Sequence, residues 1–407
     1  MKDKKEENLM DKIVSLCKRR GFIYPSSEIY GGFAGFFDYG PLGVALKNNI
    51  KKLWWKQFVT EREDMYGVDA TIITKKEVLQ ASGHVSGFAD PLPDGTRFNT
   101  MFSTSVGVGE DATIAYLRPE TAQGIFVNFK NVIDSFHPKL PFGIAQIGKA
   151  FRNEIAPRDF VFRLRELEQM EVEYFIYEKD WKVSFEMWQK TIWNFIETVG
   201  INKNQIHELE VADGERAHYS KRTIDFEFDF PFGRKELFGL AYRTDFDLKN
   251  HQVSSGIDLS YLDEETKNKI VPHVIEPSLG VERTILAILS SAYTEDELGG
   301  EKRVYLKLSP KIAPIKIAVF PLLKNKLNLV EKAREVYMML KKEFEAVVFD
   351  DNGNIGKRYR RQDEIGTPHC VTIDFDSLEN NDVTVRDRDT GKQERIAISE
   401  LVKYLKI

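Results

Sequence analysis

Cysteine is scarce in this chain of 407 residues, with Cys17 and Cys370 as its only two. Two cysteines cannot build a disulfide framework, and no Cys-x-x-Cys pair is present to suggest a zinc site. Long apolar runs are lacking too: no stretch approaches the roughly 18–20 residues that span a bilayer, and the charged start Met1–Asn8 has no signal-peptide core behind it. These absences predict a cytoplasmic protein that has no membrane partner and binds no zinc.

A large excess of charge of either sign is also missing. Lys and Arg number 58 against 63 Asp and Glu, which gives a net charge of −5. The overall field of the protein therefore does not attract nucleic acid, and any RNA binding would depend on local basic patches. Hydrophobic residues, at 42%, are plentiful enough for two or three domains with substantial cores.

The hydrophobic pattern changes along the chain and divides it into two predicted domains. A helix is expected to end at Gly21, and apolar residues recur at helical spacing after Pro41 and over 180–200. Strict alternation from Ile224 to Phe230 instead predicts a half-buried strand of an antiparallel sheet. After a connector around Tyr305–Pro314, short apolar runs alternate with one helix. We therefore expect an α+β fold, with an antiparallel sheet flanked by helices in residues 1–309 and a mixed α/β domain in residues 310–407.

Two polar strand faces carry the strongest chemical signal. Arg152 and Glu154 are two residues apart and would share a face of a strand. After a loop, polar side chains again share one parity, at Arg163, Arg165, Gln169, Glu171 and Glu173. One such face is ordinarily a solvated surface with salt bridges, but two faces joined by a short loop favour a polar binding platform. Guanidinium groups suit phosphate, and carboxylates suit an ammonium group or a magnesium ion.

These segments resemble the signature motifs of class II aminoacyl-tRNA synthetases. Phe151-Arg-Asn-Glu154, a variable loop and the returning segment Arg163–Glu171 look like motif 2, and Glu276-Pro-Ser-Leu-Gly-Val-Glu-Arg283 looks like motif 3. Leu117–Asn128 is similar to a stretch that glycyl-tRNA synthetases share. The resemblance extends from about Ile23 to Ile407 and indicates the homodimeric bacterial and eukaryotic type of that family. It implies that glycine is activated with ATP to glycyl-adenylate and then transferred to the 3′ end of tRNA-Gly.

The resemblance also assigns residues to ATP. Arg152, Glu154 and Arg283 would be the catalytic residues, with Arg152 on the α-phosphate and Arg283 stacked on the adenine. The whole ATP site would comprise Arg152, Asn153, Glu154, Phe162, Arg163, Leu164, Arg165, Glu166, Leu167, Glu236, Leu237, Gly280, Val281, Glu282 and Arg283. Glu236 would also bind the Mg²⁺ that accompanies ATP, although that residue alone would ordinarily be a carboxylate at the end of a strand.

Glycine selection is implied at a second set of positions. The substrate site would comprise Arg97, Glu120, Leu167, Glu168, Gln169, Met170, Glu171, Glu276, Pro277, Ser278, Leu279 and Gly280. Glu120 would bind the substrate ammonium. Because glycine has no side chain to hold, a close wall of carboxylates would have to reject larger amino acids by overlap. Such overlap discriminates well, whereas a merely missing methylene changes binding by only about 1–3 kcal/mol.

Residues 310–407 resemble an anticodon-binding domain, through Gly356–Pro368 and Val383–Asp389. Four basic residues surround Tyr359, and such a mixture suits unstacked RNA bases. By the resemblance they would contact tRNA, and they are Lys357, Arg358, Arg360 and Arg361. Nearby carboxylates leave an ordinary charged surface equally open on composition alone.

Two features depart from the family pattern. Leu167 stands where many members have an aromatic residue that stacks on adenine, and Phe88–Phe98 lacks the cysteine-bearing insertion that some members carry. His84 is interpreted as a structural histidine. The helix after Pro41 would hold motif 1 and the dimer interface, with Trp54 and Trp55 exposed there.

The sequence leaves two alternatives to this function. The first is a non-catalytic synthetase-like nucleic-acid-binding subunit, which the presence of Arg152, Glu154, Arg283, Glu120 and Ser278 disfavours. The second is a class II synthetase for another small amino acid, which Leu117–Asn128 and the Glu276-Pro-Ser segment disfavour.

Overall fold

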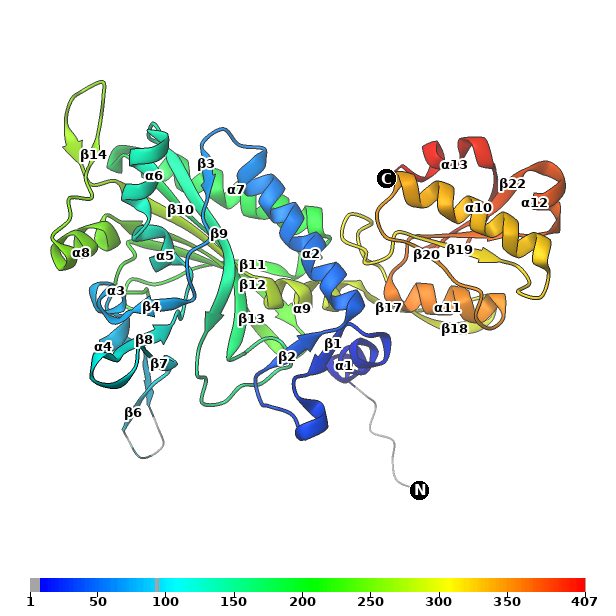
Figure 1. Ribbon diagram of the computed structural model, residues 1–407, viewed down its shortest axis with the longest axis horizontal. Helices are drawn as coiled ribbons and strands as arrows, with labels where there is room; N and C mark the ends of the chain where they lie inside the picture. Colours follow the sequence, from blue (N-terminus) through cyan, green and yellow to red (C-terminus); the bar gives the residue numbers. More distant parts are fainter. Residues whose placement is uncertain (1–7, 92–93, 95, 407) are drawn as a thin grey trace.

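The computed structural model describes residues 8–91, 94 and 96–406. It shows a large domain and a smaller C-terminal domain side by side (Figure 1). The stretch Met1–Glu7, on which the expected absence of a signal peptide rests, lies outside the described residues. Within the described part of the chain, no helix is long and apolar enough to cross a membrane.

A seven-stranded sheet forms the centre of the large domain, in the order β11-β12-β13-β16-β10-β9-β3. Neighbouring strands run antiparallel, except that β3 runs parallel to β9. The strands are β3 (Met65–Gly67), β9 (Phe142–Phe151), β10 (Glu166–Ile176), β11 (Ile206–Glu210), β12 (Arg222–Phe230), β13 (Gly233–Thr244) and β16 (His273–Gly280). In β12 the alternating apolar residues from Ile224 to Phe230 are buried, which confirms the predicted strand.

Helices cover both faces of this sheet. On one face, α2 (Pro41–Trp55), α7 (Trp181–Val199) and α9 (Val281–Ala292) form the main core with alternate side chains of the strands. On the other face, α5 (Ala122–Phe126), α6 (Phe129–Phe136) and α8 (Phe246–Ser255) form a second core around Phe142 and Phe175, at one end of the sheet. The remainder of that second face is available for a binding site.

Local sequence signals account for the ends of the N-terminal helices. α1 (Leu9–Arg20) ends at Gly21, whose φ of 77° favours glycine, and α2 begins at Pro41 as predicted. Trp54 of α2 is wholly buried and stacks on Phe58 at 4.9 Å between ring centroids. The expectation that Trp54 is exposed at a dimer interface is therefore wrong, because this position of the helix faces the core.

Several small elements lie outside the main sheet. β1 (Ile23–Pro25) and β2 (Phe37–Tyr39) precede α2 in the chain. Those between β3 and α5 are β4 (Ile73–Lys75), α3 (Lys76–Ala81), α4 (His84–Gly87), β5 (Ala89–Pro91), β6 (Arg97–Asn99), β7 (Ser103–Val106) and β8 (Thr113–Leu117). Buried Arg118 anchors the end of β8, since its Nε donates to the backbone oxygen of Lys149 at 2.6 Å and its Nη1 to that of Ala70 at 2.7 Å. This anchor places the next segment, with Glu120, beside β9 and β10.

The C-terminal domain contains a mixed five-stranded sheet in the order β20-β19-β21-β22-β23. Its elements are β19 (Ile317–Pro321), α10 (Leu327–Glu343), β20 (Val347–Phe349), α11 (Ile355–Ile365), β21 (His369–Ile373), α12 (Phe375–Asn380), β22 (Asp382–Asp387), β23 (Gln393–Ala397) and α13 (Ile398–Leu405). A separate core forms between this sheet, α10 and α13, which agrees with the predicted α+β fold of two parts. Ile312 and Ala313 of the connector still pack in the core of the large domain.

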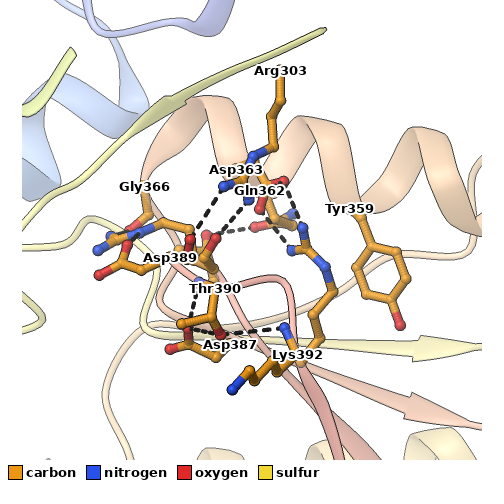
Figure 2. Close-up of polar contacts among 12 residues, drawn as sticks. Arg303, Tyr359, Gln362, Asp363, Gly366, Asp387, Asp389, Thr390 and Lys392 are labelled. Atoms are coloured by element: carbon orange, nitrogen blue, oxygen red, sulfur yellow. Dashed lines mark hydrogen bonds and ion pairs between the residues drawn. The ribbon is translucent and has the colours of Figure 1, made fainter. Parts of the chain in front are cut away.

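A buried ion-pair network joins the two domains (Figure 2). The hairpin of β17 (Tyr293–Leu298) and β18 (Glu301–Leu306) leaves α9 and lies against α11. Arg303 on β18 pairs with Asp296 at 2.6 Å and with Asp363 of α11 at 3.4 Å. Asp363 also accepts hydrogen bonds from both terminal nitrogens of Arg386, at 2.8 and 2.9 Å. Asp363 thus holds two buried guanidinium groups, one from each domain.

Replacing Asp363 by asparagine is expected to lower the free energy of unfolding of the C-terminal domain by about 1–2 kcal/mol. The amide removes the negative charge and leaves a single acceptor oxygen for two guanidinium groups. Urea denaturation measures the change. Asp376→Asn is the matched control, since Asp376 is exposed in its ion pair with Arg395, and it should change stability by less than about 0.5 kcal/mol. Equal midpoints for both variants would contradict a stabilising role for Asp363.

Candidate active site

A cavity of about 640 Å³ opens on the sheet face that α5, α6 and α8 leave uncovered. β10, β13 and β16 contribute its floor, and the segment after β9 and the start of α9 contribute its sides. The predicted residues that line it are Glu120, Arg152, Glu154, Phe162, Arg163, Leu164, Leu167, Gln169, Glu171, Glu236, Leu237, Glu276, Ser278, Gly280, Glu282 and Arg283. The polar segments singled out in the sequence therefore meet at one cavity.

Strand alternation selects which of these side chains reach the cavity. β10 and β16 are antiparallel neighbours, with Gln169 opposite Gly280 and Glu171 opposite Ser278. All four line the cavity. In antiparallel strands, directly opposed residues point to the same face, so each pair places two groups on the cavity floor.

The residues between them point the other way. Met170 and Leu279, which also oppose one another, are buried in the main core together with Val281. Glu168 turns toward α2, where its carboxylate pairs with Lys47 at 2.7 Å and with Lys51 at 2.8 Å. The predicted side-chain contacts of Met170, Glu168 and Leu279 with the amino acid are therefore wrong in this structure, because every second strand residue faces away. The predicted side-chain contact of Val281 with ATP is wrong as well, because Val281, the first residue of α9, is buried in the main core.

Five other predicted residues lie outside the cavity lining, namely Arg97, Asn153, Arg165, Glu166 and Pro277. Arg165 donates to the backbone oxygens of Glu154 and Ala34, both at 3.0 Å, so it braces the loop. Glu166 forms an ion pair with Lys149 across the strands. Arg97 lies on β6 and is exposed.

The segment after β9 is a turn rather than a continued strand. β9 ends at Phe151, so Arg152 and Glu154 follow the strand instead of sharing a face of it. The Nε of Arg152 donates to the backbone oxygen of Pro119 at 3.0 Å, and the carboxylate of Glu154 accepts from the Nε of Arg163 at 2.6 Å. These bonds fix two arginines on one side of the cavity.

Arg283, in the first turn of α9, defines one end of the cavity. Its guanidinium lies 4.5 Å from the centroid of the Phe162 ring, and its Nη1 contacts the backbone oxygen and the carboxylate of Glu236, at 3.0 and 3.1 Å. Leu167 also lines the cavity. A planar cation braced by an aromatic ring offers its free face to another flat group, such as a base.

Asp225 of β12 is a cavity residue that the sequence did not single out. Burial, and then the negative charges of Glu236 and Glu227, raise the pKa of Asp225 to about 7. These carboxylates concentrate negative charge close to Arg283, and a bound cation would relieve their repulsion.

Buried carboxylates form the opposite end of the cavity. Glu171 accepts hydrogen bonds from the hydroxyls of Ser278, at 2.8 Å, and Thr121. Glu120 accepts from the amide of Gln123 at 3.0 Å and lies 3.3 Å from Nε2 of His84. These groups, with Glu276, can surround a small cation such as an ammonium group.

Arg243 of β13 is the buried cation beside this carboxylate cluster. It pairs with Asp247 of α8 at 2.8 Å and with Glu276 at 2.9 Å. The pKa of Glu276 is raised to about 8, mainly by burial. The positive charge of Arg243 acts to lower this pKa, whereas the negative charges of Glu171 and Glu120 add to the increase. Burial also acts to raise the pKa of Glu120, but the interactions with His84 and Arg243 outweigh burial, and the pKa of Glu120 is lowered. The site is therefore short of positive charge.

Arg243, Asp247 and His84 were missed as site residues, His84 having been interpreted as structural. One signal in the sequence could have indicated Arg243: it shares parity with Gly239 and Ala241, which line the cavity. His84 and Asp247 come from other elements, and no local pattern connects them with the cluster.

The basic residues predicted to contact RNA lie on α11, and the structure separates them. Arg358 is wholly buried and donates to the backbone oxygens of Pro321, Asp351 and Gly353. The prediction that Arg358 contacts RNA is wrong here, because its guanidinium is used to bind these backbone oxygens inside the domain. Lys357 and Arg360 are exposed, and Arg361 pairs with Asp350 at 2.6 Å.

Known proteins share both parts of this architecture. Residues 108–292 match the family model described as tRNA synthetase class II core domain (G, H, P, S and T), and residues 316–407 match that of the anticodon binding domain. A glycine–tRNA ligase of Clostridium tetani is 50% identical over 98% of each chain. Those of Thermobifida fusca and Caldanaerobacter subterraneus are 48% and 47% identical, each over 97% of both chains. The alignment with the Clostridium protein covers 461 residues, more than the 407 of this chain, so that relative has residues with no counterpart here.

Proposed function

The chain belongs to the glycine–tRNA ligase family of class II aminoacyl-tRNA synthetases, and we propose that the cavity on its sheet is where glycine and ATP react. The protein is accordingly a ligase that attaches glycine to tRNA. One observation supports this location above the others: a single cavity has arginines suited to phosphate on one side and buried carboxylates suited to ammonium at its far end.

In the proposed reaction an oxygen of the glycine carboxylate attacks the α-phosphorus of ATP. The bond from that phosphorus to the bridging oxygen breaks, so pyrophosphate leaves and glycyl-adenylate remains. A terminal ribose hydroxyl of tRNA-Gly then attacks the carbonyl carbon, and AMP leaves. Arg152 binds the α-phosphate and the glycine carboxylate, Glu154 orients Arg163 for the nucleotide, and no side-chain nucleophile is needed. The enzyme contributes positioning and charge stabilisation.

Mg²⁺ accompanying ATP would be held by Glu236. The raised pKa of Asp225 beside Glu236 and Glu227 supports this assignment, because it reflects negative charge that a cation would neutralise. The ion supplies charge neutralisation to the phosphate oxygens. We expect no zinc, and the free thiols of Cys17 and Cys370 are each buried in a different domain.

Replacing Leu167 by phenylalanine is expected to lower the KM for ATP by about 2–10-fold. In the proposed pose adenine lies between Leu167 and Arg283, and an aromatic ring would add roughly 0.5–1.5 kcal/mol of stacking. Steady-state pyrophosphate exchange at varied ATP measures this change. Leu167→Ala should act in the opposite direction, and the KM for glycine should stay constant in both variants. An unchanged KM for ATP in Leu167→Phe would place adenine elsewhere.

Glycine selection is proposed to depend on Glu120, Glu171, Glu276 and Ser278. Glu171 is fixed by Ser278 and Thr121, and Glu276 by Arg243. A rigid, hydrogen-bonded wall cannot retreat to admit a β-carbon, so larger amino acids would be rejected by overlap.

ATP–pyrophosphate exchange with each amino acid in turn tests the proposed function. Glycine should support exchange, and alanine and serine should not. Exchange driven equally by alanine or serine would overturn selection by exclusion. If no amino acid supported exchange, the non-catalytic binding subunit would become the better interpretation.

The remaining proposals concern assembly and location. We propose a homodimer, because Ile29 and Tyr30 of the segment before α2 are 89% and 87% exposed, and such apolar surface favours a partner. Light scattering should give twice the mass of the chain.

We place the domain boundary near residue 310, supported by the separate cores, and the site of action in the cytoplasm. Lys357, Arg360 and Arg361 are proposed to contact tRNA-Gly.

A further inference from the structure

Glu173 is a buried carboxylate that the proposed reaction does not use. It lies on β10, two residues beyond Glu171, and its side chain has no exposed surface. Both of its oxygens are without a hydrogen-bond partner among the residues that the structure describes. An unpaired buried carboxylate is strongly unfavourable when ionised, so this side chain requires an explanation.

Glu173 lies behind the carboxylate end of the cavity, next to Glu171 and Glu276 but not in the lining itself. Oxygens of Glu171, Glu173 and Glu276 all lie within 4.8 Å of one another. The register that sets Glu171 opposite Ser278 and Tyr174 opposite Ile275 sets Glu173 opposite Glu276. The side chain of Glu173 therefore lies beside the carboxylate that we assign to the substrate ammonium.

The charged groups around Glu173 cannot compensate a further negative charge. Glu171 is on its own strand, Glu276 on β16, Arg243 on β13 and Asp247 on α8. Glu120 lines the cavity, and His84 lies beside Glu120. Arg243 is already shared between Asp247 and Glu276. Glu171 accepts hydrogen bonds at both of its oxygens, whereas Glu276 accepts a side-chain hydrogen bond at Oε1. The other oxygen of Glu276 can thus accept a hydrogen bond from a protonated Glu173.

We propose that Glu173 is a protonated carboxylic acid whose hydroxyl donates to Glu276, and that it is a positioning residue for glycine. This inference rests on the proposed function, because it takes Glu276 as a ligand of the substrate ammonium. The hydrogen bond favours the ionised form of Glu276, against the burial and neighbouring charges that raise its pKa, and leaves its other lone pairs for the ammonium. A neutral acid acts here as a donor that adds no charge to a site already short of cations.

The electrostatics agree with this arrangement. Burial, and then the charge of Glu276, raise the pKa of Glu173 well above its ordinary value. A carboxyl group whose folded-state pKa is raised stabilises the fold below its unfolded-state pKa, and that contribution is lost as the pH rises through the folded-state pKa. Without glycine, the protein should therefore lose stability as the pH rises toward alkaline values, and part of this loss should come from Glu173.

Two substitutions at Glu173 test the proposal. In Glu173→Gln the amide can still donate to Glu276 without a charge, so the KM for glycine in pyrophosphate exchange should stay within about threefold of the parent. Glu173→Leu removes the donor, and its KM for glycine should rise about tenfold or more, with the KM for ATP unchanged. Glu186→Gln, at an exposed position of α7, is the control and should change neither constant. A merely structural role would not separate glycine from ATP in this way.

Thermal unfolding between pH 6 and 9, without substrates, gives an independent test. Glu173→Gln should lose less stability than the parent as the pH rises, because it has no carboxyl group to ionise. Infrared difference spectra at neutral pH should show a protonated-carboxyl band in the parent that Glu173→Gln lacks. These readouts need no enzymatic activity, so they test the proton on Glu173 even if glycine does not support exchange.

Three results would overturn the proposal. Glu173→Gln could prove as impaired as Glu173→Leu, its unfolding could follow the same pH dependence as the parent, or the purified protein could hold a metal ion that Glu173→Gln loses. The last result would mean that the three carboxylates share a cation rather than a proton. Failure of exchange with glycine in the parent would instead overturn the proposed function.

Discussion

Replacing Arg152 by alanine is expected to reduce glycine-dependent ATP–pyrophosphate exchange by about 10²–10³-fold or more. Arg152 lines the cavity and is held by its bond to the backbone oxygen of Pro119, the residue before Glu120. In the proposed reaction it faces the α-phosphorus, where negative charge increases in the transition state. Removing one preorganised donor at such a position costs an enzyme about two to three orders of magnitude in rate.

The matched variant is Arg152→Lys. Lysine retains the charge but cannot bridge two acceptors with a planar fork, so we expect an intermediate rate. Unfolding temperatures of both variants should stay near that of the parent, since Arg152 is only half-buried. Exchange retained in Arg152→Ala would mean that the α-phosphate binds elsewhere in the cavity.

Replacing Arg243 by methionine is expected to lower the free energy of unfolding at pH 8 by about 3–5 kcal/mol. Methionine keeps an unbranched side chain that can fill part of the same space, but it lacks the cation that pairs with Asp247 and Glu276. Breaking a buried ion pair from one side leaves the partner charges uncompensated. The same change should abolish saturable use of glycine, because Glu276 would lose the group that orients it.

The pH dependence makes this prediction specific. Glu276 and its neighbours bind protons more readily without Arg243, so the difference from the parent should shrink as the pH falls toward 5. Arg234→Met on the same strand is the control, because Arg234 forms a partly exposed pair with Asp229 and should contribute about 1 kcal/mol or less. A difference below about 1 kcal/mol for Arg243→Met at pH 8 would contradict the assigned role.

Several site residues could be recognised from sequence because their motifs keep them together. Glu276, Ser278 and Arg283 fall within one short segment, and the turn from a strand into a helix puts all three at the cavity. The resemblance led to wrong assignments where every residue of a motif was assigned to the site. Met170 and Leu279 belong to the motifs, but strand alternation places them in the core.

The α11 segment shows a different failure. Its basic residues suggest an RNA surface, yet Arg358 is buried and donates to the backbone oxygen of Pro321. Asp363 on the same helix forms ion pairs with Arg386 and with Arg303 of β18. Composition cannot separate a surface arginine from one that is buried against backbone oxygens. That difference depends on which helix face packs inward, and Arg358 packs against residues of its own domain.

The sequence by itself determined the family, the two-part α+β fold and the identity of the groups on the cavity floor, because these depend on local periodicity and on motifs of close spacing. The tertiary structure alone decided the electrical balance of the site. It brought Arg243, Asp247 and His84 to the carboxylates from other elements. Among the residues that the structure describes, it gave neither carboxylate oxygen of buried Glu173 a conventional hydrogen-bond donor. Charge interactions act through space and depend on burial, so no pattern along the chain could reveal them.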